Sequence, residues 1–308
     1  METARSPVAP VDRRPRFDTP NVLWFFGAFA AGGGSTAVVA AVHPAHRGVW
    51  IFLVALGFLT VYALLSAVLL RTGWWVPGGV LAATAVGLVP AVGVGFERLV
   101  GVWPGAGVSF DPFQRFEGAL FALGLATIAA GLVAFALVRF DFLLSTVAAA
   151  TLFTTQLLLP AFVSRPGVGD HAVTSLVVGA LLVAGGLALD RLGRRRAAFW
   201  LHVFGLLGVA GGLGYYAARH GHAWAWVVLL VAGAVILLLA APLRRATWAA
   251  YGLAGFYAAI GHYVSSWFGS WRAPLVLAAA GLGLVLLGMA LHSGSLTRLL
   301  RLDRLPVP

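Results

Sequence analysis

The 308-residue chain contains no cysteine and no lysine, and only 10% of its residues are charged. The absence of cysteine excludes disulfides, thiolate metal sites, cysteine nucleophiles and covalently attached c-type haem. Without lysine, no side-chain amine can form a Schiff base with retinal or pyridoxal phosphate. Soluble domains carry about 25% charged residues, so the shortage of charge favours a protein that lies in a membrane.

The rest of the composition supports a membrane location. Hydrophobic residues make up 60% of the chain, and its mean hydropathy is +0.93. A helix needs about 20 apolar residues to cross the hydrocarbon, and runs of this kind follow one another continuously, without the alternation of barrel strands. The sequence predicts an all-α, polytopic transmembrane helix bundle with about ten spans, near residues 22–42, 49–70, 75–96, 118–138, 142–163, 172–189, 197–217, 224–242, 246–267 and 273–291.

The distribution of arginine predicts the orientation. The formal net charge is +11 and all 21 basic residues are arginine. With both termini inside, fifteen arginines lie on the cytoplasmic side and six outside, as the positive-inside rule requires. We therefore expect a multi-pass protein of the bacterial cytoplasmic (inner) membrane, and no nucleic-acid partner. The alternative is removal of the first apolar segment, because residues 39–41 resemble a signal-peptidase site.

Three parts of the chain are expected. Residues 1–20 are rich in proline and arginine and predict a flexible cytoplasmic tail. Residues 21–292 form the bundle, whose longest outer loop is 97–117. Residues 293–308 mix leucine and arginine at helical spacing, which indicates an amphipathic cytoplasmic tail against lipid head groups. The lipid bilayer is thus the first expected partner.

The predicted spans contain few groups for chemistry. No aspartate, glutamate or arginine lies deep within any span. Since a buried carboxylate is the usual proton carrier, a simple carboxylate-driven antiporter is disfavoured, while a uniporter, flippase or channel is not. No nucleophile–base pair can be assembled, so a membrane enzyme ranks third among the hypotheses, after a transporter or binding protein and a scaffold or sensor. The third span carries Pro77, Gly78, Gly79, Gly87 and Pro90, as an interrupted helix would.

A group of mild polar residues indicates a ligand pocket. Gln156 in the fifth span and His262 in the ninth lie at a similar depth in the outer third of the bilayer. Helical spacing on the ninth span adds Tyr251 and Ser265 or Ser266 to the face of His262, and Thr155 is a further polar candidate beside Gln156. The alternative is that these groups form helix–helix hydrogen bonds, each contributing about 1 kcal/mol.

Two histidine pairs have the spacing of metal ligands. His43 and His46 are three residues apart, and His220 and His222 are two apart, all near outer span ends. Neutral imidazole binds zinc or copper, so these pairs are candidate Zn or Cu sites. The alternative is histidines solvated at the membrane surface, with no cofactor.

Several short segments resemble a group of bacterial integral-membrane proteins that has no assigned activity. They are residues 75–79 (WVPGG), 110–116 (FDPFQRF), 198–207 (AFWLHVFGLL) and 251–256 (YGLAGF) after an arginine pair. The resemblance covers roughly residues 75–290 and implies a polytopic fold, with no catalytic residue to carry over. The ten-span plan is also similar to that of the drug/metabolite transporter superfamily, in topology only.

These features predict an integral membrane protein that binds or translocates a small or amphipathic molecule, with a pocket near Gln156 and His262. The alternative is a non-transporting membrane scaffold or sensor whose outer loop 97–117 contacts a protein partner of unknown identity.

Overall fold

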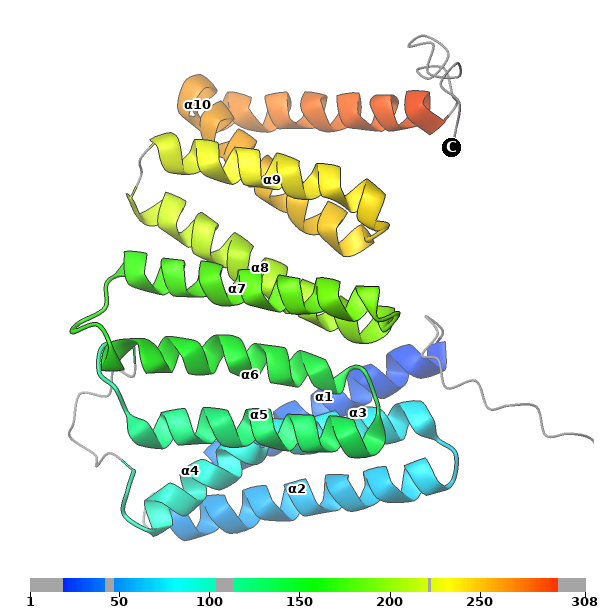
Figure 1. Ribbon diagram of the computed structural model, residues 1–308, viewed down its shortest axis with the longest axis vertical. Coiled ribbons are helices and arrows are strands. Elements are labelled where there is room, and N and C mark those ends of the chain that lie inside the picture. The colour runs from blue at the N-terminus through cyan, green and yellow to red at the C-terminus, as the bar shows by residue number, and fades with distance from the viewer. Residues whose placement is uncertain (1–18, 42–46, 104–112, 221–222, 293–308) are drawn as a thin grey trace, which may run out of the picture. The chain divides into compact units, whose positions relative to one another are not determined.

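The computed structural model describes residues 19–41, 47–103, 113–220 and 223–292. This part of the chain is helical and forms two compact units, Met1–Arg219 and His220–Pro308. In the first unit, consecutive apolar segments run in opposite directions (Figure 1). Its helices are α1 (Thr19–Ala40), α2 (Arg47–Arg71), α3 (Trp75–Gly87), α4 (Val89–Leu99), α5 (Gly118–Val138), α6 (Leu143–Leu158), the 3-10 turn η2 (Leu159–Ala161), α7 (Val168–Arg191) and α8 (Arg195–His220). The second unit contains α9 (Ala223–Leu243) and α10 (Ala246–His292).

Eight segments of the described chain are long and apolar enough to cross a membrane. They coincide with the first eight predicted spans, and many of their large apolar side chains face outward, such as Leu137 (80% exposed) and Phe26 (74% exposed). An apolar exterior of this kind is solvated by lipid tails and not by water. The prediction of a helical multi-pass membrane protein is confirmed, whereas the number of ten and the orientation stay predictions.

The third predicted span is one apolar segment built from two helices. Helix α3 ends at Gly87 and α4 begins at Val89. Pro90 has no N–H to bond to the carbonyl of Val86, and its ring disfavours a continuous helix. The N–H of Leu88 instead bonds to the Ala85 carbonyl at 3.1 Å, three residues back. The interruption expected from the prolines and glycines of this segment is therefore present at Gly87–Pro90.

Helix α10 covers both of the last two predicted spans. It has 47 residues, which corresponds to about 70 Å at 1.5 Å per residue, more than twice the hydrocarbon thickness of roughly 30 Å. Its ribbon changes direction part-way along (Figure 1). One straight crossing is thus excluded by length, and the separate ninth and tenth spans stay a prediction. The predicted tails of residues 1–20 and 293–308 lie almost entirely outside the described residues.

The core of the first unit lies where α1, α3 and the start of α6 meet. Buried side chains from these elements form one apolar cluster around Val80, Phe140 and Leu143. Close approach depends on glycine: a side chain at Gly79 would overlap the Phe140 ring, and one at Gly95 would overlap the backbone of Phe52 on α2. In lipid the hydrophobic effect does not drive helices together, so their association depends on close packing contacts of this kind.

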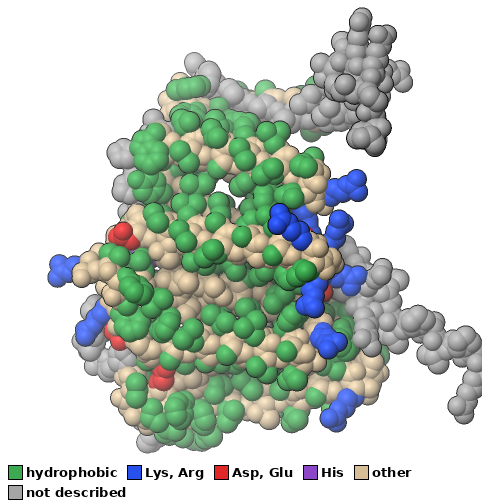
Figure 2. All heavy atoms as spheres, in the orientation of Figure 1, with side chains coloured by type: hydrophobic (Ala, Val, Ile, Leu, Met, Phe, Trp, Pro, Cys, Tyr) green, Lys and Arg blue, Asp and Glu red, His purple; other side chains and the backbone are tan. Residues whose placement is uncertain are grey.

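Charged side chains gather at the helix ends. Figure 2 shows most of the described arginines at one edge of the molecule and apolar side chains between the ends. The C-terminal ends of α2, α5 and α7 supply Arg71, Arg139 and Arg191, and the α7–α8 turn supplies Arg194–Arg196. We call this the arginine-rich end.

The Gly95 contact generates a stability prediction. Gly95→Ala places a methyl group against the Phe52 backbone, which cannot move without separating α4 from α2. We expect a loss of about 1–3 kcal/mol in the free energy of unfolding, measured by thermal unfolding in detergent micelles. Gly57→Ala on α2 is the matched control, because a Cβ there meets nothing within 4 Å. The control should be neutral or up to about 1 kcal/mol more stable; equal losses in both variants would contradict this packing account.

Candidate functional site

Gln156 on α6 makes hydrogen bonds to a neighbouring helix, the alternative that the sequence left open, with partners that the sequence did not identify. Its Nε2 donates to Ser175 Oγ at 2.7 Å and to the His171 carbonyl at 3.3 Å, and its Oε1 lies 2.8 Å from His171 Nδ1. Both partners are on α7, which follows α6 after a short connection. The amide therefore joins α6 to α7 through its own hydrogen-bonding groups.

The same group holds the described end of the outer loop. His171 Nε2 lies 3.2 Å from the Phe113 carbonyl, and Gln114 Nε2 donates to the Pro166 carbonyl at 3.0 Å. The Phe113 ring meets the rings of Phe153 and His171 edge-on. Both ring nitrogens of His171 thus face carbonyl oxygens, and only a doubly protonated ring can donate to both at once.

The other predicted pocket residues have local partners. His262 stacks on Trp226 of α9, with ring centroids 4.0 Å apart and an interplanar angle of 6°. Gln156 belongs to the first unit and His262 to the second. The prediction that they line one pocket is not tested by these contacts and stays a prediction.

Three predicted hydroxyls bond within their own helix, which is the alternative use that serine and threonine have in membrane helices. Thr155 donates to the carbonyls of Thr151 and Leu152. Ser265 donates to the His262 carbonyl, and Ser266 to that of Tyr263. Tyr251 lies half-buried on α10.

The structure does not describe the side chains of the predicted metal ligands. His43, His46 and His222 lie outside the described residues, and the side chain of His220, at the end of α8, is not described either. Among the described residues no group of three or more His, Cys, Asp or Glu side chains has a metal-binding arrangement. Zinc or copper binding at these histidines stays a prediction.

A buried histidine–carboxylate pair joins α7 to α8. His202 is fully buried, and its Nε2 lies 2.9 Å from Asp190 Oδ2. Gly186 makes room for the ring, because a side chain there would overlap it. The sequence analysis did not identify this pair. The sequence feature that could have indicated the pair is the short turn between α7 and α8. Such a turn places residues at the end of one helix beside residues at the start of the next.

Two neighbouring cavities lie beside the break between α3 and α4 and share lining residues. The first, which we call the Phe142 cavity, has a volume of about 370 Å³ and lies among α1, α3, α6 and α8. The second, the Thr154 cavity, has a volume of about 350 Å³ and lies among α3–α6. They share three lining residues: Gly87, Thr146 and Ala149.

The two cavities follow one another along the helices. Residues 80–88 of the α3–α4 segment line the Phe142 cavity, and residues 87–94 line the Thr154 cavity. On α6, which runs in the same direction, the corresponding linings are 142–149 and 146–154. At 1.5 Å per residue, together they cover about 20 Å of helix length, most of the hydrocarbon thickness of roughly 30 Å.

Hydroxyl groups supply the polar lining of both cavities. Thr36, Thr84, Ser145 and Thr127 each donate to a carbonyl of their own helix, so their oxygens still have lone pairs that can accept a hydrogen bond. Thr154 is 3% exposed, and its Oγ1 has no hydrogen-bond partner among the described residues. An unsatisfied buried hydroxyl costs about 1–3 kcal/mol, which a bound molecule would offset.

The Gln156 group generates a second prediction. Gln156→Leu leaves Ser175 and His171 without their partner, so we expect a loss of about 1–3 kcal/mol in stability and faster amide hydrogen exchange in residues 113–117. Thr155→Val is the neighbouring control, since its hydroxyl bonds only within α6; we expect a change within about 0.5 kcal/mol and unchanged exchange. Unaltered exchange at 113–117 in Gln156→Leu would show that this group does not hold the loop.

Comparison with known proteins adds no relative to this picture: no family model matches the chain, and neither the curated proteins nor the solved structures gave a match.

Proposed function

We propose that this integral membrane protein binds and translocates a small uncharged molecule through the Phe142 and Thr154 cavities. The observation that carries the proposal is that the two cavities share Gly87 as a lining residue, where α3 gives way to α4. Broken helices that face a cavity are a common element of substrate sites in membrane transporters. This proposal places translocation at α3–α6, apart from the predicted pocket at Gln156 and His262.

The lining favours an uncharged molecule. Among the described residues, neither cavity is lined by an aspartate, glutamate, arginine or histidine. A charge within the hydrocarbon is costly unless a counter-charge or water compensates it. Hydroxyl oxygens and the rings of Phe29, Phe142 and Phe153 instead suit a molecule with a hydroxyl or amide group and an apolar surface.

Gly87 provides a direct test. It lines both cavities, and a Cβ at this position meets nothing within 4 Å. In Gly87→Leu the Cβ therefore has room, and we expect the rest of the side chain to occupy space in the cavities that Gly87 lines. We expect the protein to fold normally and the passage to be closed. Gly57→Leu is the control, since Gly57 is equally unobstructed and lies on the exposed face of α2.

The measurement is the re-swelling rate of proteoliposomes after osmotic shrinkage with glycerol or with urea. Wild type and Gly57→Leu should re-swell faster than protein-free vesicles, and Gly87→Leu should re-swell at the protein-free rate. If wild-type vesicles are no faster than protein-free ones for either solute, or if Gly87→Leu matches wild type, the proposed passage is wrong.

A second candidate function is a membrane scaffold or sensor that acts through the outer loop 97–117. Two contacts favour it. His171 of α7 lies against the Phe113 carbonyl at the end of this loop, and Gln114 of the loop donates to the Pro166 carbonyl just before α7. Wild-type vesicles without flux would make this the leading function.

A further inference from the structure

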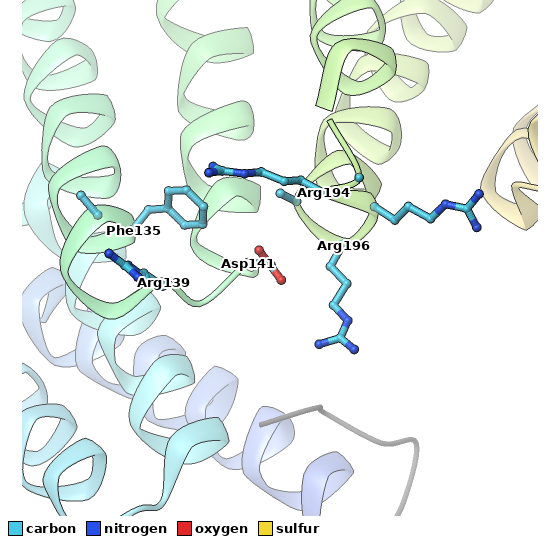
Figure 3. Close-up of a pocket in the computed structure, with 9 residues that line it drawn as sticks. Phe135, Arg139, Asp141, Arg194 and Arg196 are labelled. Carbon is cyan, nitrogen blue, oxygen red and sulfur yellow. The ribbon is translucent and has the colours of Figure 1, made fainter. Parts of the chain in front are cut away.

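An open cavity of about 860 Å³ lies at the arginine-rich end of the first unit. Its lining comes from the end of α5, the α5–α6 connection and the α7–α8 turn. Figure 3 shows Asp141 near its centre, with Arg139 on one side and Arg194 and Arg196 on the other. The lining residues are Phe135, Ala136, Arg139, Asp141, Gly193, Arg194, Arg195, Arg196 and Ala197; we call this the arginine cavity.

Turn geometry brings these arginines together. Arg139 ends α5 in the left-handed conformation with φ 54°, which reverses the chain towards Asp141. Gly193 has φ 74° and makes the tight turn that starts α8 at Arg195. The first turn of α8 therefore points its positive dipole end at the same cavity.

The cavity is positively charged as a whole. Four arginines, whose guanidinium groups stay charged at every accessible pH, line the cavity together with a single carboxylate, that of Asp141. Arg196 and Arg194 lie close enough to Asp141 to lower the pKa of its carboxyl, but burial has the larger effect and raises that pKa. Neither arginine forms a direct ion pair with a carboxylate among the described residues. Their guanidinium groups therefore have donors available for another anion.

We infer that the arginine cavity binds a phosphate group. Guanidinium groups recognise phosphate through paired N–H donors in a planar arrangement, and Arg139, Arg194 and Arg196 supply such groups from two segments, the end of α5 and the α7–α8 turn with the start of α8. The volume exceeds what a bare phosphate needs and admits a larger phosphate-bearing molecule. Since the cavity lies at the ends of membrane-spanning helices, the phosphate belongs either to an acidic lipid head group or to a soluble phosphate compound.

The test measures binding of the full-length protein in detergent to two probes. One is dioleoylphosphatidylglycerol, with dioleoylphosphatidylcholine as the zwitterionic control; the other is inorganic phosphate. Arg139→Gln, Arg194→Gln and Arg196→Gln should each weaken phosphatidylglycerol binding roughly fivefold, the effect of one basic charge near a membrane surface. Arg191→Gln is the matched control, because it removes the same charge from the end of α7 and does not line the cavity.

Asp141→Asn provides a gain-of-affinity variant that misfolding cannot mimic. Removing the carboxylate takes away the only negative side chain in the cavity lining, so phosphatidylglycerol should bind roughly fivefold more tightly at neutral pH.

The outcomes separate the two sources. If inorganic phosphate displaces phosphatidylglycerol, the cavity is assigned to a soluble phosphate compound. If it does not displace the lipid, the cavity is assigned to a lipid head group. Both results support a phosphate site. Equal weakening by Arg191→Gln and the cavity variants overturns the inference, because it would reduce the effect to net charge. The inference is also overturned if phosphatidylcholine binds more tightly than phosphatidylglycerol, or if Asp141→Asn binds phosphatidylglycerol with unchanged affinity.

Discussion

The structure depends on one constraint: the hydrocarbon offers no water to peptide N–H and C=O groups, so the chain must bond them internally. Continuous helices meet that requirement in α2 and α5. At Pro90 the pattern fails, because the missing N–H leaves a carbonyl of α3 without its usual partner. Irregular backbone at membrane depth is tolerated only inside protein or beside a cavity. The Phe142 and Thr154 cavities lie at this position, so the helix break and the candidate passage have a common physical origin.

Close helix packing follows from the same solvent. Lipid tails do not drive apolar helix surfaces together, so association depends on contacts that only small residues permit. In the first unit Gly179 of α7 lies against the backbone of Gly205 and Val209 on α8; in the second, Gly233 of α9 lies against Phe256 of α10. The composition of 39 glycines is therefore informative about packing. Gly87 differs from these positions, because nothing lies within 4 Å of its missing Cβ.

Hydrophobic runs predicted the helices well, and they predicted α5 with the bounds 118–138 that it has. They could do so because a span is a local property of about 20 residues. Partnership between spans is not local. Helical periodicity identified Gln156 as a polar position but could not identify the helix that it faces, which is α7. For the same reason His202 and Asp190 were not paired, and the cavities at Gly87 required the three-dimensional arrangement of α1, α3, α5 and α6.

The two candidate sites call for different ligands. A phosphate held by Arg139, Arg194 and Arg196 is a charged group in contact with compensating charges at a membrane surface. The cavities at Gly87 have hydroxyl oxygens, which accept hydrogen bonds and do not neutralise an anion. Moving the phosphate from one to the other would therefore leave its charge uncompensated within the hydrocarbon, at a cost that such a lining cannot offset. Under the two proposals, a phosphate at the arginine cavity would thus be a resident or regulatory ligand, and the molecule that passes Gly87 would be a separate, uncharged one.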